Sequence, residues 1–552
     1  MDAVPVAASS SYFTTSLFYP LVFIVASLWA VHWYIENLRI VRMGNKLPGP
    51  KTVPFFGNAL LAFGVAPEDV MGEVIKYLHY GRVIRAFLGT KLIVFLIDPR
   101  DVEIILGSHV HLDKSAEYRF FKPWLGEGLL ISTGEKWRTH RKIIAPTFHL
   151  NVLKTFVPLF YENSLDLVKR LKLEVGKKFD IHDYLSAVTV DILLDTAMGV
   201  RGGKREKTGF DYAMAVMKLC NIVHQRQYNF MLRMDPVFKW SKYATKQEQL
   251  LSIIHGLTRG IMDKRKKDYE EKGEDAYPEE LRQGKSIDSK TTEIIKSSNM
   301  KYVRDDLDEI DENDVGEKRR LAFLDLMLEL SRNGANMTED EVREEVDTIM
   351  FEGHDTTAAG SSFTLCVLGI HQDIQERVME ELDSIFKGSD RPCTFQDTLE
   401  MKYLERVIME SLRMFPPVPA IARHLNEDVK LASGDYVLPR GTTVIIAQYQ
   451  IHRLEEYYPN PEVFDPDRFL PENTQSRHYY AYVPFSAGPR SCVGRKYAML
   501  KLKVLISTIL RNYKILSDLT EADFRLQLDI ILKRTDGFPI WIEPRTKTTN
   551  VM

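Results

Sequence analysis

Residues 17–35 carry no formal charge, and this uncharged run constrains the chain more than any other stretch of the sequence. Only Pro20, Ser27 and His32 interrupt its apolar side chains. As a helix that rises about 1.5 Å per residue, the run would span about 28 Å, close to the thickness of the hydrocarbon core of a membrane. We therefore expect residues 1–36 to form a short lumenal tip and a transmembrane anchor helix.

A cleavable signal peptide is the alternative interpretation of this run. The run is longer than the apolar core of a usual signal peptide, and no Lys or Arg precedes Arg39. Basic residues follow it instead, so the positive-inside rule keeps the body of the chain in the cytosol. Residues 37–54 contain these charges and the sequence Leu47-Pro-Gly-Pro-Lys-Thr-Val-Pro54, whose prolines exclude helix and sheet and predict a stiff linker.

The composition of the chain excludes several classes of protein. Of its 552 residues, 45% are hydrophobic, which indicates a folded protein with a large core and not a disordered chain. The net charge is −3 at pH 7, so no overall positive field would attract nucleic acid. The four cysteines include no C-x-x-C pair and are too few for a secreted disulfide scaffold, which agrees with a reducing compartment.

Residues 55–545 are expected to form one catalytic domain, because no Gly-, Ser- or Pro-rich linker of convincing length divides them. Long helical patterns fill most of this body, so the predicted fold is mainly α with small β-sheets. The strand patterns occupy residues 83–98, with a turn at Gly89-Thr90, residues 436–447, and residues 528–543, with a turn at Asp536-Gly537.

One segment of the body, residues 268–320, differs from the rest in composition. It contains 17 acidic and 10 basic residues, a local net charge of −7. This density of charge predicts a solvated, partly disordered insertion and not a packed element. A short tail, residues 546–552, follows the body.

Cys492 lies in a loop that suits a reactive thiolate. The loop reads Phe485-Ser-Ala-Gly-Pro-Arg-Ser-Cys-Val-Gly494, and a helical run, residues 495–510, follows it. Glycines let backbone amides approach sulfur, and an arginine and a helix start supply positive charge, so Cys492 could be an iron ligand. For an isolated cysteine a buried, inert thiol is the default interpretation, and we apply it to Cys220, Cys366 and Cys393.

This loop resembles the F-x-x-G-x-R-x-C-x-G loop of the cytochrome P450 haem-thiolate monooxygenases at every fixed position: Phe485, Gly488, Arg490, Cys492 and Gly494. The resemblance implies the cytochrome P450 fold, a haem b cofactor and Cys492 as the axial ligand of its iron. It also implies that electrons come from NADPH through a reductase.

Further motifs of that family extend over nearly the whole chain. Glu410-Ser-Leu-Arg413 resembles the E-x-x-R helix, and Pro466-Asp-Arg-Phe469 resembles the motif that follows it. Read alone, the first pair would be a surface ion pair worth less than about 1 kcal/mol. The resemblance implies instead that Glu410, Arg413 and Arg468 form a structural network that supports the haem.

The haem propionates have four candidate partners. Trp137-Arg-Thr-His-Arg141 fits the W-x-x-x-R helix of the family, and Arg423 and Arg490 are similar to its remaining propionate partners. The guanidinium group suits carboxylates because it offers two parallel hydrogen bonds.

A long helix is predicted from the capping box Thr338-Glu-Asp-Glu341 to about His371. Within it, Glu352-Gly-His-Asp-Thr-Thr357 places a glycine beside threonines that can bond back to helix carbonyls and open the helix. A helix that tolerates one glycine is the plainer interpretation. The family resemblance implies that Gly353 makes room for dioxygen, while Asp355 and Thr356 deliver protons.

Glu352 narrows the resemblance to one branch of the family. A Glu at this position resembles the pattern of family 4 members, in which this acid forms an ester with a haem methyl group. Such members oxidise fatty chains, often at the terminal carbon. The charged insertion is similar to that of the insect G subfamily, whose members convert long-chain aldehydes into cuticular hydrocarbons by oxidative decarbonylation. The resemblance therefore predicts this activity, with a fatty-acid ω-hydroxylase as the alternative. A haem-binding sensor without turnover is a remote third reading, and Asp355-Thr356 argues against it.

The resemblance also implies partners and location. We expect a single-pass protein of the endoplasmic reticulum membrane that acts on long-chain lipid and accepts electrons from NADPH-cytochrome P450 reductase, with cytochrome b5 as a second candidate donor. Basic residues after Cys492 are expected to meet the acidic reductase, although a solvated helix face would explain them equally well. They are Arg495, Lys496, Lys501 and Lys503. Candidate pocket-lining residues lie in 115–130 and at the Asp536-Gly537 turn.

Overall fold

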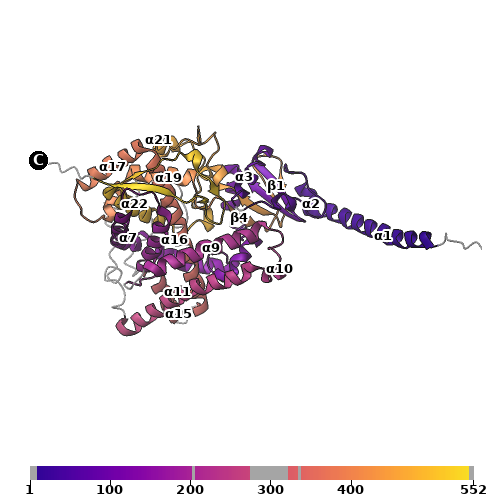
Figure 1. The fold of residues 1–552 in the computed structure, drawn as a ribbon, viewed down its shortest axis with the longest axis horizontal. Coiled ribbons are helices and arrows are strands. Elements are labelled where there is room, and N and C mark those ends of the chain that lie inside the picture. Colours follow the sequence, from indigo (N-terminus) through magenta and orange to yellow (C-terminus); the bar gives the residue numbers. More distant parts are fainter. Residues whose placement is uncertain (1–8, 67, 202–205, 274–320, 333–336, 546–552) are drawn as a thin grey trace, which may run out of the picture.

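The computed structural model describes residues 9–66, 68–201, 206–273, 321–332 and 337–545 (Figure 1). The charged insertion falls almost entirely outside these residues, as do residues 1–8, where the lumenal tip is expected, and the tail 546–552. The described chain is mostly helical. Its α-helices are α1 Ser9–Asn37, α2 Arg39–Gly44, α3 Val70–Ile75, α4 Pro99–Leu106, α5 Lys122–Leu125, α6 Gly134–Ile144, α7 Leu150–Leu171, α8 Ile181–Asp195, α9 Glu206–Tyr228, α10 Asp235–Lys239, α11 Lys242–Lys272, α15 Phe323–Arg332, α16 Glu339–Ile370, α17 Gln372–Phe386, α18 Phe395–Glu400, α19 Lys402–Met414, α20 Gln448–Ile451, α21 Pro471–Thr474 and α22 Arg495–Asn512.

Four small sheets complete the described fold. Their strand orders are β1-β2-β7-β4, β3-β11-β8, β5-β6 and β10-β9, and β2 and β7 are the parallel pair. The strands are β1 Val83–Leu88, β2 Lys91–Leu96, β3 Phe179–Asp180, β4 Ile421–His424, β5 Val429–Lys430, β6 Val437–Leu438, β7 Thr443–Ile446, β8 Tyr513–Leu516, β9 Leu526–Gln527, β10 Lys533–Arg534 and β11 Pro539–Pro544. The prediction of a mainly α fold with small sheets is confirmed.

The strand prediction is confirmed in full for one stretch, and in the other two the structure has strands whose pairing differs from a simple hairpin. Residues 83–98 form the expected β1-β2 hairpin with its turn at Gly89-Thr90. Residues 436–447 contain two strands that belong to different sheets, β6 and β7. Residues 528–543 do not form a hairpin, because β10 pairs with β9 whereas β11 pairs with β3 and β8. The Asp536-Gly537 turn therefore connects two sheets.

Helix α16 passes through the centre of the body, with α8, α19 and α22 packed against it (Figure 1). The predicted capping box is confirmed at its start: Thr338 Oγ accepts from Glu341 N at 3.2 Å, and Thr338 N donates to Glu341 Oε2 at 2.9 Å. Both faces of the helix are covered along most of its length, so its side chains form part of the largest hydrophobic core.

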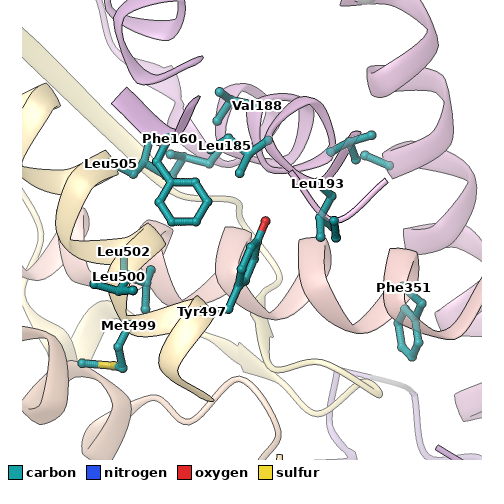
Figure 2. Packing of buried hydrophobic residues seen from close by; sticks show 14 of the residues in the cluster. Phe160, Leu185, Val188, Leu193, Phe351, Tyr497, Met499, Leu500, Leu502 and Leu505 are labelled. Carbon is teal, nitrogen blue, oxygen red and sulfur yellow. The ribbon is translucent and has the colours of Figure 1, made fainter. Parts of the chain in front are cut away.

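Helix α22 is enclosed in the same core. Figure 2 shows Tyr497 of α22 beside Phe160 of α7 and Leu193 of α8. The rings of Tyr497 and Phe160 lie 5.2 Å apart in an edge-to-face arrangement, and Tyr497 OH lies 2.8 Å from Thr196 Oγ. The helix that follows Cys492 is thereby held on two sides.

Helix α1 extends away from the body (Figure 1), and side chains such as Phe23 and Trp29 are 73% and 68% exposed. Among the described residues, no single helix is both long and apolar enough to cross a membrane. One pair of helices, Gly134–Phe148 and Leu150–Glu174, bent by 56° relative to each other, is together long and apolar enough by length and composition alone. The expected transmembrane anchor is therefore not confirmed.

Candidate functional site

Cys492 is exposed, whereas its neighbours Ser491 and Val493 are 4% and 5% exposed. The loop is held by Cys492 N, which donates to Phe485 O at 2.9 Å. At Gly488, where φ is +69°, a Cβ would lie 2.0 Å from Leu106 O, so this position requires glycine. The loop therefore presents one thiol, just before the start of α22 after Gly494.

The other three cysteines are buried, as expected for inert thiols. Burial raises the pKa of Cys220 well above its ordinary value, and it raises the pKa of Cys366 and of Cys393 to about 12. Only thiolates act as ligands or nucleophiles, so these three thiols are unsuited to either task.

An internal hollow borders the middle of α16. Between residues 345 and 369 every residue of α16 is buried except Glu352, Gly353 and Thr356, which share one face of the helix. Lys114, in the segment before α5, is likewise only partly covered although it and Glu352 lie deep within the protein. Partial exposure at such depth means that these side chains border a space inside the body.

Positive charge is concentrated around this hollow. Arg423 is 2% exposed, and its Nη1 donates to the carbonyl oxygen of Ala422 at 3.2 Å. Lys114 is bridged to Arg423 through the backbone. Burial lowers the pKa of Lys114 well below its ordinary value. Repulsion from Arg423 and Arg490 lowers it further, whereas attraction to Glu352 acts to raise it. Burial likewise lowers the pKa of Arg490 to about 9. Desolvated cations such as these require anions to offset their cost.

Two arginines join this cluster to the cysteine loop. Arg141 Nη1 donates to Ser491 O at 2.8 Å, next to Cys492. Arg490 Nη1 donates to Leu112 O at 2.7 Å, and its Cζ lies 4.7 Å from the centre of the Trp137 ring. The structure therefore brings together all four predicted propionate partners.

The cation cluster and the thiol fit haem b, which presents two carboxylates at one edge and an iron that accepts a thiolate. Lys114 belongs to the cluster but was missed from the sequence. Its place is set by the bridge to Arg423, which lies about three hundred positions away, and no local spacing reveals such a contact.

The carboxyl group of Glu352 faces the same hollow. Burial raises its pKa to about 7. Attraction to Lys114 and Arg141 acts to lower this pKa, whereas repulsion from Glu345 acts to raise it. Thr356, which is only partly covered on the same helix face, donates from Oγ to Glu352 O at 2.6 Å. At Gly353 a Cβ would lie 2.8 Å from Leu193 Cδ2, which gives this glycine a packing reason besides the one expected for dioxygen.

Asp355 has different surroundings from Thr356. It is 3% exposed, and its Oδ1 lies 3.2 Å from Lys533 Nζ of strand β10. Burial acts to raise the pKa of Asp355, but the charge of Lys533 and the nearby His354 hold it below the ordinary value. Asp355 is therefore an ionised acid in a buried ion pair, and Lys533 is a second residue that the sequence did not reveal.

The three residues of the predicted structural network lie together. Arg413 donates to both oxygens of Glu410, at 2.7 and 2.8 Å, and both side chains are fully buried. Arg468 Nε lies 3.3 Å from Glu410 Oε1. Arg413 also donates to the carbonyls of His452 and Pro461, so the network ties α19 to the segment before the cysteine loop.

The prediction of an exposed basic surface after Cys492 is wrong. Lys501 and Lys503 are 0% and 1% exposed, and Arg495 and Lys496 are 8% and 7% exposed. The packing of α22 against α7 and α16 buries these side chains, so a partner protein cannot reach them as a patch.

Comparison with known proteins agrees with this geometry. The cytochrome P450 family model matches residues 47–538. Cytochrome P450 4g15 of Drosophila melanogaster is 53% identical, covering 96% of this chain and 98% of the relative. Cytochrome P450 4g1 of the same species is 51% identical and covers 98% of each chain. Cytochrome P450 4V2 of Homo sapiens is 35% identical, covering 91% of this chain and 89% of the relative.

Proposed function

This chain belongs to family 4 of the cytochromes P450, and we propose that it converts long-chain aldehydes into hydrocarbons one carbon shorter by oxidative decarbonylation. It is a monooxygenase-type oxidoreductase that holds haem iron and takes electrons from a redox partner. The proposal of an aldehyde substrate is supported by full-length similarity to two 4g proteins, which is the observation that carries it.

The residues of the site have separable tasks in this proposal. Cys492 supplies the thiolate to the iron, and the cations of the cluster hold the propionates. They are Lys114, Arg141, Arg423 and Arg490. When bound, haem supplies the activation of dioxygen. Thr356, on the helix face that borders the hollow, holds a proton at Oγ for the reaction, and Asp355, ionised beside Lys533, is the carboxylate that would accept and pass on a proton behind it.

Glu352 restricts how the haem can sit. We propose that its carboxyl group forms an ester with a haem methyl group, because a carboxyl group in an apolar helix otherwise lacks a partner that justifies its burial. In this step one methyl C–H bond would be replaced by a C–O bond to Glu352, and dioxygen, together with the NADPH-derived electrons of turnover, would take up the two electrons and the protons as water. Its position at the hollow, within the electrostatic reach of Lys114, supports this role. A haem fixed in this way would hold the same face toward every substrate.

The membrane assignment is also a proposal. We infer that the protein is anchored once in the endoplasmic reticulum membrane, with the catalytic body in the cytosol. Apolar side chains on the body are exposed, since Phe63 is 83% and Trp240 93% exposed. Trp240 directly follows α10, which lies on the side from which α1 extends (Figure 1). Such exposed residues favour contact with lipid.

Electrons are proposed to come from NADPH-cytochrome P450 reductase, with cytochrome b5 as a second donor. Since α22 is buried, the exposed face of α6 becomes the better candidate for this contact. Arg141 of α6 touches Ser491, so the exposed Arg138 and Lys142 on the same helix lie near the thiolate loop. An acidic partner would be attracted to these side chains.

The substrate is tested by product analysis. The purified protein is incubated with the reductase, NADPH and an aldehyde of n carbons. We expect a hydrocarbon of n−1 carbons together with a one-carbon oxide. If the sole product keeps all n carbons and gains a terminal hydroxyl group, the fatty-acid ω-hydroxylase replaces the proposed activity. That alternative is supported by the 35% identity to cytochrome P450 4V2, which shows that the resemblance extends across family 4 beyond the 4g proteins.

A further inference from the structure

Helix α22 carries two buried lysines, Lys501 and Lys503, whose partners differ. Lys503 Nζ donates to Thr398 O at 2.9 Å and pairs with Glu405 Oε2 at 2.7 Å. Lys501 Nζ instead donates to the backbone carbonyl of Gly353 at 2.8 Å. Within the part of the chain that the structure describes, no carboxylate lies at ion-pairing distance from Lys501. Lys501 is therefore a buried amine whose partner is a carbonyl of α16.

Such an amine is costly to bury, because its charged form loses hydration without gaining an opposite charge. Burial lowers the pKa of Lys501 to about 7. The ring of Tyr497, whose centre is 5.3 Å from Nζ, offsets part of the cost. An apolar side chain would fill the same space without this cost, so packing alone does not account for the lysine.

The carbonyl that Lys501 binds lies where α16 borders the hollow. Gly353 O also accepts from Thr357 Oγ at 2.8 Å, and the preceding carbonyl, Glu352 O, accepts from Thr356 Oγ at 2.6 Å. Side-chain donors that bind helix carbonyls set the local bend of a helix, so the loss of one leaves that bend less well defined. Two consecutive carbonyls thus receive side-chain donors, and Lys501 is the donor that comes from a different helix.

We propose that Lys501 is a positioning residue that holds the Gly353 carbonyl and thereby fixes the stretch of α16 on which Glu352 and Thr356 face the haem. The inference rests on the haem site proposed above and not on the identity of the substrate. Because α22 begins directly after the Cys492 loop, the bond also ties the helix behind the iron ligand to the helix that carries Glu352.

Lys501→Met tests this proposal in the full chain, since methionine fills a similar volume without a donor. We expect the thermal unfolding midpoint to stay the same or to rise, because a buried amine is removed. Hydrogen exchange in peptides covering residues 350–358 of the ferric holoenzyme should become several-fold faster. The peroxide released per NADPH oxidised should also rise several-fold, with a long-chain aldehyde or a long-chain fatty acid as the added lipid.

Lys503→Met is the matched control. It leaves Glu405 buried without its partner, so the midpoint should fall, while exchange over residues 350–358 and peroxide release stay at the wild-type level. Unchanged exchange and peroxide release in Lys501→Met would overturn the proposal, as would equal increases in both variants. Both readouts are compared with either lipid present, so a failure of the aldehyde reaction would count against the proposed substrate and not against Lys501.

Discussion

Glu352 is an acid at a position where burial makes an acid costly. The neighbouring cations act in its favour, yet burial dominates and raises its pKa to about 7. At neutral pH the group is therefore divided between its neutral and ionised forms. Conversion to an ester would remove the titratable group and with it the cost of a buried charge.

Glu352→Gln should abolish the covalent attachment of haem while the reduced carbon-monoxide spectrum stays that of a haem-thiolate protein. Denaturing chromatography after turnover measures the attachment, because esterified haem elutes with the polypeptide. Glu344→Gln is a suitable control, since Glu344 lies on the same helix but pairs with Lys136 at 3.3 Å. Free elution of all the haem from the wild-type protein would show that no ester forms.

Cys492→Ala should eliminate the thiolate-type Soret band of the reduced carbon-monoxide complex. The exposed thiol of Cys492 lies in a loop that the surrounding backbone holds in place, whereas the other thiols are buried. Cys366→Ala, which alters a buried cysteine, should keep the band. A normal band in Cys492→Ala would assign the iron ligand to another residue.

At the scale of helices and sheets, local patterns were informative where the determinant is local. The capping box at Thr338 predicted the start of α16, and Gly89-Thr90 predicted the turn of a hairpin, because each depends on residues within one turn of chain. The hairpin expected at Asp536-Gly537 does not form, because the two strands that flank this turn pair with strands of two different sheets. Strand pairing over long separations is decided by tertiary contacts.

The site shows the same division. Its motif residues were identifiable from their spacing, and the structure brings Trp137, Arg141, Arg423 and Arg490 together. Lys114 and Lys533 could not be identified, because each acquires its role from a segment distant in sequence. The lysines of α22 were misjudged for a related reason. Charged residues in a helix indicate an exposed face unless the fold provides a buried hydrogen-bond acceptor for each of them. Gly353 O is such an acceptor for Lys501, and Glu405 is one for Lys503.

The α6 helix provides a test of reductase contact. Lys142→Glu should slow reduction of the haem by the reductase several-fold at low salt, because it replaces attraction by repulsion toward an acidic partner. The difference should diminish as the salt concentration rises. Stopped-flow absorbance measures the rate, and Lys246→Glu, at an exposed lysine of α11, should leave it unchanged. Equal rates for wild type and Lys142→Glu at every salt concentration would exclude this face.

At the scale of the whole molecule, several buried histidines tie stability to pH. Burial lowers the pKa of His182 and of His452 to about 3, and it lowers the pKa of His224 and of His354 to about 4. All four are therefore neutral in the folded protein at pH 5, while the unfolded chain, with an ordinary histidine pKa of about 6.5, would take up protons.

His452 allows this linkage to be measured at one group. It is 0% exposed, and its Nε2 accepts a hydrogen bond from Val483 N at 2.9 Å. Between pH 3 and 6.5 the unfolded state binds more protons at this group than the folded state, so stability must fall as the pH is lowered through that interval. From pH 6.5 to pH 5 the loss is roughly 2 kcal/mol for one such histidine. His452→Gln should reduce the difference between denaturant unfolding midpoints at these two pH values. A wild-type pH dependence of the midpoint in His452→Gln would refute the linkage.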